Sequence, residues 1–242
     1  MMSAIHHLKH WPYQRSLIMP KSSDPYFHLP SGFDSSNTVE KPSYNLNQSR
    51  AIAISEHMYD DDTDRLHLIF GPPGKTEFEH DPFVAVTTVL FLSCLGTGKS
   101  STIAGIVMNL LSNNIFRKRK ILICAPSNTA CDELSCRILQ RLSQQEQNNQ
   151  HTLIRIGSQP PIDENLCKHF LDFLVLEKIF ETVKENPKTN KVNLTKLQEN
   201  ILNKATIIVS TLNNCASSRL SSLVDQVDFV IIDEGENEHP CF

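Results

Sequence analysis

Residues 66–106 constrain what this chain can fold into more than any other stretch. They begin with a short apolar run, LHLIF, that leads into the turn GPPG, and they end with GTGKSSTIAGI, in which a lysine and a serine open an apolar-periodic helix. A strand, a glycine-rich turn and a helix together build a loop whose backbone N–H groups surround phosphates. In such loops a lysine reaches the terminal phosphates and a hydroxyl holds Mg²⁺. The stretch therefore predicts a nucleotide-binding site.

The spacing inside this stretch departs from the loop pattern. The pattern G-x-x-x-x-G-K-[ST] requires a glycine five residues before Gly98, where the chain has Ser93. If residues 75–96 are removed, the chain closes to GPPG-TGKS, which meets the pattern at every position. We therefore interpret the segment as one phosphate loop interrupted by an insert. The residues expected to bind the nucleotide are Gly71, Pro72, Pro73, Gly74, Thr97, Gly98, Lys99, Ser100 and Ser101.

Two explanations stand for residues 75–96. Codons for Gly74 and Lys75 can contain a string with the form of an intron donor, and codons for the run up to Gly96 can supply an acceptor. One hypothesis is therefore that a retained intron has been translated, and the other is a genuine loop insertion. The transcript separates them, because a spliced message that still encodes these residues excludes an intron.

The composition restricts the classes of protein open to the chain. Its formal net charge is -4, so binding to nucleic acid would have to come from local contacts. Seven cysteines occur without a C-x-x-C pair, which is typical of reduced thiols in the cytosol or nucleus. The N-terminal residues have no signal-peptide pattern, and the longest apolar run, residues 83–95, is too short to span a bilayer. We expect no membrane association.

Apolar runs alternate with helical patterns along the chain. Strands are expected at residues 66–70, 121–125, 153–156, 205–211 and 228–232. Helices are expected from residue 46 with Asn47 as the cap, at 99–113, from the turn at 126–129 through 142, and over 166–203 with a polar break at 186–188. This alternation predicts the α/β class, a parallel sheet with helices on both faces and its chemistry at the carboxyl ends of the strands.

The domain organisation follows from the same patterns. Residues 1–44 lack periodicity and are expected to be a mobile or low-structure leader. Residues 45–234 are expected to form the domain, with the insert at 75–96 and a helical insertion at 158–204, and residues 235–242 are expected to be an aberrant tail. The basic run at residues 117–120 is expected to be a solvated connector.

The last expected strand, VIIDE, ends in two carboxylates. In a P-loop NTPase such a strand completes the site, with Asp233 binding Mg²⁺ through water and Glu234 orienting or deprotonating the attacking water. An Asp-Glu pair after an apolar strand is by itself a modest signal. Together with the GTGKS helix in an alternating α/β chain, it indicates an NTPase.

Several segments, taken in order, carry a family resemblance. They are LNQS, LIFGPPG with TGKSSTI, ILICAPSNTACDEL, IRIG, IIVSTL and VIIDE. In order and spacing they resemble the first RecA-like domain of superfamily 1 helicases, and they look most like the senataxin-like branch. The resemblance covers about residues 45–234 without the insert. It implies a P-loop NTPase (RecA-like) sheet, an ATP-dependent RNA or DNA helicase, ATP and Mg²⁺ as cofactors, and single-stranded RNA or DNA as a partner. It also implies a nuclear or cytoplasmic location, with the nucleus favoured.

The resemblance also implies roles for single residues. Lys99 would bind the β- and γ-phosphates, Ser100 and Asp233 would hold Mg²⁺, and Glu234 would be the catalytic base. Five residues would contact the nucleic-acid backbone: Pro126, Ser127, Asn128, Ser210 and Thr211. Small hydroxyl and amide side chains at helix starts suit such contacts. The alternative for the turn at 126–129 is helix capping, which Asn128 and Thr129 could provide.

Two departures from the family pattern limit the expected activity. Arg50 stands where the family has an adenine-reading glutamine, with Gln48 two residues earlier, and the sequence after VIIDE differs from the family's. The chain as written stops after the VIIDE strand, whereas the family continues into a second motor domain that supplies an arginine to the γ-phosphate. We therefore expect these 242 residues alone to be a poor ATPase and no helicase. The alternative is a non-catalytic nucleic-acid or nucleotide-binding fragment.

Overall fold

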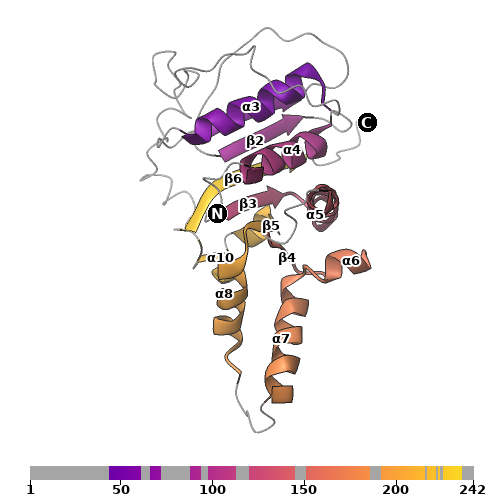
Figure 1. The fold of residues 1–242 in the computed structure, drawn as a ribbon, viewed down its shortest axis with the longest axis vertical. Coiled ribbons are helices and arrows are strands. Elements are labelled where there is room, and N and C mark those ends of the chain that lie inside the picture. Colours follow the sequence, from indigo (N-terminus) through magenta and orange to yellow (C-terminus); the bar gives the residue numbers. More distant parts are fainter. Residues whose placement is uncertain are drawn as a thin grey trace, which may run out of the picture.

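The computed structural model describes residues 44–60, 66–71, 88–93, 98–112, 120–144, 151–185, 192–215, 217–221, 223 and 226–235. Within these ranges the chain forms a six-stranded parallel sheet in the order β1-β2-β6-β3-β5-β4 (Figure 1). The strands are β1 (Leu66–Gly71), β2 (Thr88–Ser93), β3 (Lys120–Ala125), β4 (Leu153–Ile156), β5 (Ile207–Thr211) and β6 (Val227–Gly235). The helices are α3 (Leu46–Asp60), α4 (Lys99–Ser112), α5 (Asn128–Ser143), α6 (Glu164–Cys167), α7 (Leu171–Glu185), α8 (Leu194–Lys204), α9 (Leu212–Cys215) and α10 (Ser218–Ser221). The leader and the tail expected from the sequence lie outside the described residues, apart from Tyr44 and Gly235.

Helices cover both faces of this sheet, which confirms the predicted α/β class. On one face, α3, α4 and α5 pack onto alternate strand residues, including Ile121 and Ile123 of β3. On the other face, α7 and α8 pack onto the strand residues that alternate with these, such as Leu122 of β3 and Ile208 of β5. Because successive side chains of a strand point to opposite faces, the central strands are apolar on both sides. The apolar residues that recur at helical spacing along α4 are buried: Ile103, Ile106, Val107, Leu110 and Leu111.

The start of α3 differs from the prediction. The helix begins at Leu46, so the expected cap at Asn47 is wrong. Asn45 precedes the helix and pairs reciprocally with Gln48. The Gln48 backbone N–H donates to Asn45 Oδ1 at 2.9 Å, and the Asn45 N–H donates to Gln48 Oε1 at 3.0 Å. This capping box satisfies the backbone N–H groups of Asn45 and Gln48. The helix is therefore capped by Asn45, the earlier of the two asparagines.

The segment interpreted as an insert contributes a strand to the interior of the sheet. β2 lies between β1 and β6 and pairs with both. Each residue of β1 pairs with the residue 22 positions later, from Leu66 with Thr88 to Gly71 with Ser93. The sequence TVLFLS is rich in β-branched and aromatic residues, which suits an interior strand. Because β2 is separated from α4 by a short link, it is the strand that leads into that helix, and β1 takes the sheet edge.

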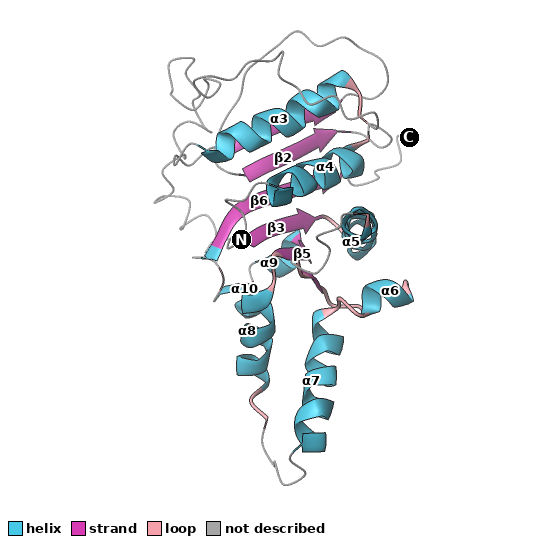
Figure 2. Cartoon of the chain, viewed as in Figure 1, coloured by secondary structure: helices cyan, strands magenta, loops and turns pink. Residues whose placement is uncertain are grey.

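Helices α7 and α8 project beyond the β5–β4 end of the sheet (Figure 2). The end of α8 is closed by Lys120 of β3, whose Nζ donates to the carbonyls of Leu202, Asn203 and Ala205 at 3.1, 2.7 and 2.8 Å. Carbonyls at a helix C-terminus lack partners within the helix and attract cations. Lys120 is therefore buried, and the prediction of a solvated connector is wrong for this residue.

Candidate nucleotide site

Strand ends gather predicted site residues at one edge of the sheet. Asp233 lies near the end of β6, between β2 and β3, and its backbone pairs with Phe91 of β2. Ala125 and Thr211, the last residues of β3 and β5, pair with each other at the same edge. The carboxyl ends of parallel strands are where such folds bind ligands. The edge thus carries both the carboxylate of β6 and the starts of α4 and α5.

Gly98 forms the turn into α4. Its φ is 82°, which L side chains rarely adopt, and a Cβ atom at this position would lie 2.5 Å from Gln48 Nε2. Gln48 Nε2 donates to Gly98 O at 3.4 Å, and Thr102 Oγ1 donates to the same carbonyl at 3.1 Å. The backbone conformation therefore requires a glycine here, whereas the end of the Gln48 side chain could shift to make room for a Cβ atom. Gln48 stands two residues before the family's glutamine position. Its side chain contacts the backbone of the predicted loop at Gly98.

Lys99 and Asp233 meet at the start of α4. Lys99 is the first residue of the helix, and its Nζ lies 3.8 Å from Asp233 Oδ1. The two side chains are 13% and 10% exposed, so the pair is largely shielded from water. The lysine of the predicted phosphate loop and the carboxylate of the last strand are thus brought together from positions far apart in the sequence.

The environment of Asp233 is suited to a cation. Burial raises the pKa of this carboxyl; Lys99 lowers it and Glu133 of α5 raises it further. Asp233 Oδ1 is buried and accepts no hydrogen bond from the described residues. An unsatisfied buried carboxylate oxygen is a hard ligand of the kind that Mg²⁺ prefers, and Ser100, the second residue of α4, follows Lys99 directly. These residues therefore fit a magnesium ion.

Ser101, the last residue assigned to the loop, contacts α5. Its Oγ accepts a hydrogen bond from Arg141 Nη2 at 2.9 Å, and the Arg141 guanidinium lies over the ring of Tyr44, 5.0 Å from its centroid. Burial lowers the pKa of Arg141. In this arrangement Ser101 joins α4 to α5.

The first half of the predicted loop is separated from the second. Gly71 ends β1, and β2 lies between β1 and β6, so Gly71 is two strand spacings, or about 10 Å, from the strand that carries Asp233. Pro72, Pro73, Gly74 and Thr97 lie outside the described residues, as does the side chain of Glu234. The structure brings Lys99, the residue after Gly98, to Asp233, and it does not bring Gly71 to them. The physical reason is chain connectivity, because β2 is nearer to Gly98 along the chain.

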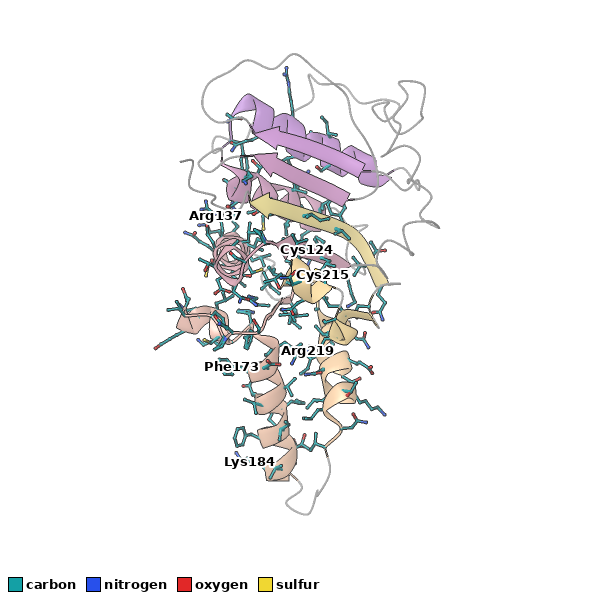
Figure 3. All side chains as sticks on the ribbon, turned by 180° about the vertical axis from the view of Figure 1, so that it is seen from behind. Cys124, Arg137, Phe173, Lys184, Cys215 and Arg219 are labelled. Atoms are coloured by element: carbon teal, nitrogen blue, oxygen red, sulfur yellow. The ribbon has the colours of Figure 1, made fainter. Side chains whose placement is uncertain are left out.

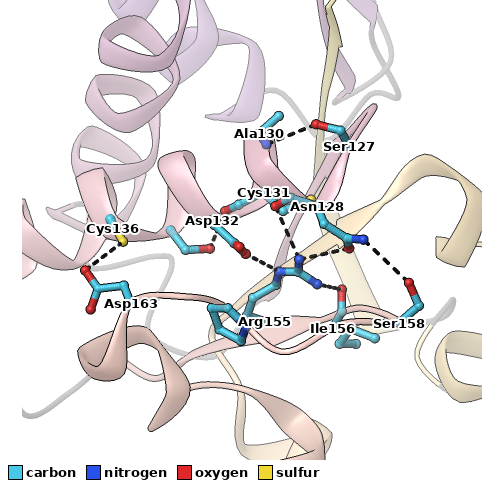
Figure 4. A network of polar contacts seen from close by, with 12 residues as sticks. Ser127, Asn128, Ala130, Cys131, Asp132, Cys136, Arg155, Ile156, Ser158 and Asp163 are labelled. Carbon is cyan, nitrogen blue, oxygen red and sulfur yellow. Dashed lines mark hydrogen bonds and ion pairs between the residues drawn. The ribbon is translucent and has the colours of Figure 1, made fainter.

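The turn between β3 and α5 is held by a buried arginine (Figure 4). Arg155 of β4 is fully buried. Its Nε donates to Asp132 Oδ1 at 2.9 Å, its Nη2 to Asn128 Oδ1 at 3.0 Å and its Nη1 to Ile156 O at 2.7 Å. Asn128 Nδ2 in turn faces Ser158 Oγ at 3.5 Å. Asn128 is thereby fixed with its amide nitrogen directed away from the arginine.

The remaining predicted nucleic-acid residues divide into exposed and buried positions. Ser127 is exposed and caps α5, since its Oγ accepts from the N–H of Ala130 at 3.1 Å; Pro126, before it, is partly exposed. The cap is therefore Ser127, and not Asn128 or Thr129 as the capping alternative supposed. Ser210 and Thr211 at the end of β5 are 0% and 7% exposed, and Ser210 Oγ donates to Thr211 O at 3.4 Å.

Two residues of the site, Glu133 and Arg155, were not singled out from the sequence, and Gln48 was noted only for standing two residues before the family's glutamine position. Gln48 contacts the loop, Glu133 acts on Asp233 through its charge, and Arg155 organises the turn before α5. The signal for Arg155 is a lone charge inside the apolar run LIRI, where a buried cation needs partners. The signal for Gln48 is its place three residues after Asn45, the spacing of a capping box.

Comparisons with known proteins agree with the resemblance carried by the motifs. A family model described as an AAA domain matches residues 44–193 and 175–236. Probable helicase senataxin of Homo sapiens is 30% identical over 114 residues, 39% of this chain and 4% of that protein. Probable helicase MAGATAMA 3 of Arabidopsis thaliana is 32% identical over 119 residues, 48% of this chain and 14% of that protein. Helicase SEN1 of Saccharomyces cerevisiae is 32% identical over 152 residues, 60% of this chain and 6% of that protein.

The chain therefore spans only a small part of the length of these relatives. Among the described residues, no helix is long and apolar enough to cross a membrane.

Proposed function

This chain belongs to the AAA domain family, and on that premise we propose that it is the nucleotide-binding part of an ATP-dependent helicase motor. The observation that carries the proposal is the contact between Lys99 Nζ and Asp233 Oδ1, 3.8 Å apart at the carboxyl edge of a parallel sheet. A lysine that opens a helix and a buried carboxylate that ends a neighbouring strand are the two charged groups that such a site needs. The similarity to three helicases supports the same function.

Each charged or hydroxyl group of the site has a proposed part. When bound, ATP would supply the phosphoanhydride bond that is cleaved, and Mg²⁺ would offset the negative charge of the phosphates. Lys99 would exchange its contact with Asp233 for the β- and γ-phosphates, and the carboxylate of Asp233 and the hydroxyl of Ser100 would hold the cation. Glu234, next to Asp233 in β6, orients the attacking water or takes its proton. The second half of the loop, Gly98 to Ser101, surrounds the phosphates through its backbone.

Single-stranded RNA or DNA is the proposed partner. The exposed Ser127 and the fixed amide of Asn128 lie at the start of α5, and Thr211 ends β5 at the same sheet edge. Hydroxyl, amide and helix N-terminal N–H groups bind a phosphate backbone without reading bases. Because the chain's formal net charge is -4, these local contacts and not an overall basic field carry the binding. On the same resemblance we propose a nuclear location.

A second candidate function is favoured by the separated loop. Gly71 is two strands away from β6, so the loop is not assembled as one continuous cradle around Lys99. A chain in this arrangement would bind a nucleotide or nucleic acid without turning ATP over. We therefore propose that residues 75–96 interrupt an otherwise intact site, and that nucleotide binding by these 242 residues is weaker than by a chain with an uninterrupted loop.

Binding of a fluorescent ATP analogue with Mg²⁺ tests the proposal. Lys99→Ala should weaken binding by at least about tenfold, since it removes the positive charge that contacts the phosphates in the proposed site. Lys184→Ala, which removes an exposed lysine on α7, should leave binding unchanged. Equal binding by the wild-type chain and Lys99→Ala would exclude the site. Hydrolysis stimulated by single-stranded RNA or DNA separates the motor from the non-catalytic binder.

A further inference from the structure

Two cysteines meet at the carboxyl edge of the sheet, beside the site described above. Cys124 lies in β3 and Cys215 ends α9, and their Sγ atoms are 2.9 Å apart although the residues are 91 positions apart in sequence (Figure 3). Cys215 Sγ also lies 3.3 Å from the carbonyl oxygen of Thr211, to which it can donate. The two sulfur atoms are therefore in direct contact, one held by β3 and the other by α9, the helix that follows β5.

The surroundings give the two thiols different accessibility. Cys124 is 3% exposed, whereas Cys215 is partly exposed. The hydrogen bond from Cys124 lowers the pKa of Cys215, and a hydrogen bond with Ser210 adds to this effect against the opposing effect of burial. The hydrogen bond with Cys215, and next burial, raise the pKa of Cys124. A reagent from solvent reaches Cys215 first, and Cys215 is the one of the two that is more readily a thiolate.

We propose that Cys215 and Cys124 form a peroxide-reactive thiol pair that closes to a reversible disulfide. The Cys215 thiolate attacks a peroxide, so that its S–O bond forms as the O–O bond breaks, and one water leaves after protonation. The Cys124 thiol then displaces the hydroxyl of the Cys215 sulfenic acid, so that the S–S bond forms and a second water leaves. The two thiols together lose two electrons and two protons, which the peroxide accepts, and a dithiol reductant restores them.

The other described cysteines have different neighbours. Cys136 Sγ of α5 faces Asp163 Oδ2 at 3.9 Å, and burial together with nearby carboxylates raises the pKa of this thiol. Cys167 donates to the carbonyl of Pro161 at 3.4 Å. Cys131 is fully buried, and its burial raises its pKa to about 12. Contact with a second sulfur and partial exposure coincide at Cys215, which is what a resolving mechanism needs.

Peroxide treatment of the whole 242-residue chain, followed by non-reducing digestion and mass spectrometry, tests the pair. We expect a cross-link, with the loss of two hydrogen atoms, between the tryptic peptides of residues 121–137 and 205–219. Because the first peptide also contains Cys131 and Cys136, fragmentation on either side of Pro126 must assign the linked sulfur to Cys124. A dithiol should reverse the link. A link through Cys131 or Cys136, or oxidation of Cys215 with no link, overturns the proposal.

Two substitutions sharpen the assignment. Cys124→Ser should leave Cys215 as a sulfenic acid that dimedone traps, and Cys136→Ser should leave the link unchanged. Closing a loop of 91 positions should also raise the Tm of the oxidised chain by several degrees, about 5 °C or more, relative to the reduced chain. The first mapping uses the unsubstituted chain, so it stands even where a variant fails to fold.

Discussion

Gly71 of β1 pairs with Ser93 of β2, and Ser93 pairs on its other side with Gly235 of β6. Ser93 stands five residues before Gly98, which is the position that the phosphate-loop pattern assigns to a glycine. If residues 75–96 were absent, Gly71 would stand five residues before Gly98 and β1 could enter the place of β2. The constant offset of 22 positions between the paired strands equals the length of the segment to be removed. We therefore interpret the two strands as alternative entries into α4.

Deleting residues 75–96 should join the two halves of the loop. We expect at least about tenfold tighter binding of the fluorescent ATP analogue, because the backbone N–H groups of Gly71 and Gly74 are added to those of residues 97–100. Titration with Mg²⁺ present measures the gain, and Lys99→Ala in the shortened chain should remove it. Unchanged affinity in a shortened chain that keeps its helical circular dichroism would contradict the interrupted-loop interpretation.

The sheet was largely predictable and its order was not. Leu153–Ile156 was predicted with the bounds that β4 has, because a short apolar run between polar turns leaves few alternatives. β2 was missed because its residues were interpreted as part of an insert. Lys120 was misjudged because a run of four basic residues is typical of solvated surface, and its partners lie 82 to 85 positions later. Contacts of such separation, like those of Lys99 with Asp233, depend on strand order, which local patterns do not contain.

Asp233→Asn should separate folding from nucleotide binding. Burial raises the pKa of this carboxyl in the folded chain, so the folded state binds more protons than the unfolded state between the two pKa values. The wild-type contribution of Asp233 to stability therefore falls as the pH rises through that window, and the neutral amide avoids this cost. We expect an equal or higher Tm at pH 7 together with loss of Mg²⁺-dependent nucleotide binding. A lower Tm with binding intact would contradict the assignment of Asp233 to the cation.

Arg155→Met should destabilise the chain strongly. It removes the partner of Asp132 and Asn128 inside the protein, and breaking a buried ion pair costs about 3–5 kcal/mol. For a chain of this length that is a fall in Tm of roughly 6–20 °C. Arg137→Met is the matched control, since Arg137 forms an exposed pair with Glu133 on one helix face and should change stability by no more than about 0.5 kcal/mol. Comparable shifts in the two variants would show that the network around Arg155 is not what holds the turn.

Lys120→Met should change both the stability and its dependence on pH. The substitution leaves three carbonyls at the end of α8 without their donor, at a cost of about 2–3 kcal/mol. Burial lowers the pKa of Lys120 below 10.5, and Asp228 offsets part of this, so the unfolded chain binds more protons between the folded pKa and 10.5. The contribution of Lys120 therefore makes the free energy of unfolding rise with pH in that window, and Met removes the rise. Urea unfolding of wild type, Lys120→Met and the exposed control Lys184→Met at pH 7 and at higher pH measures this, and a wild-type-minus-Lys120→Met difference that stays constant with pH would contradict it.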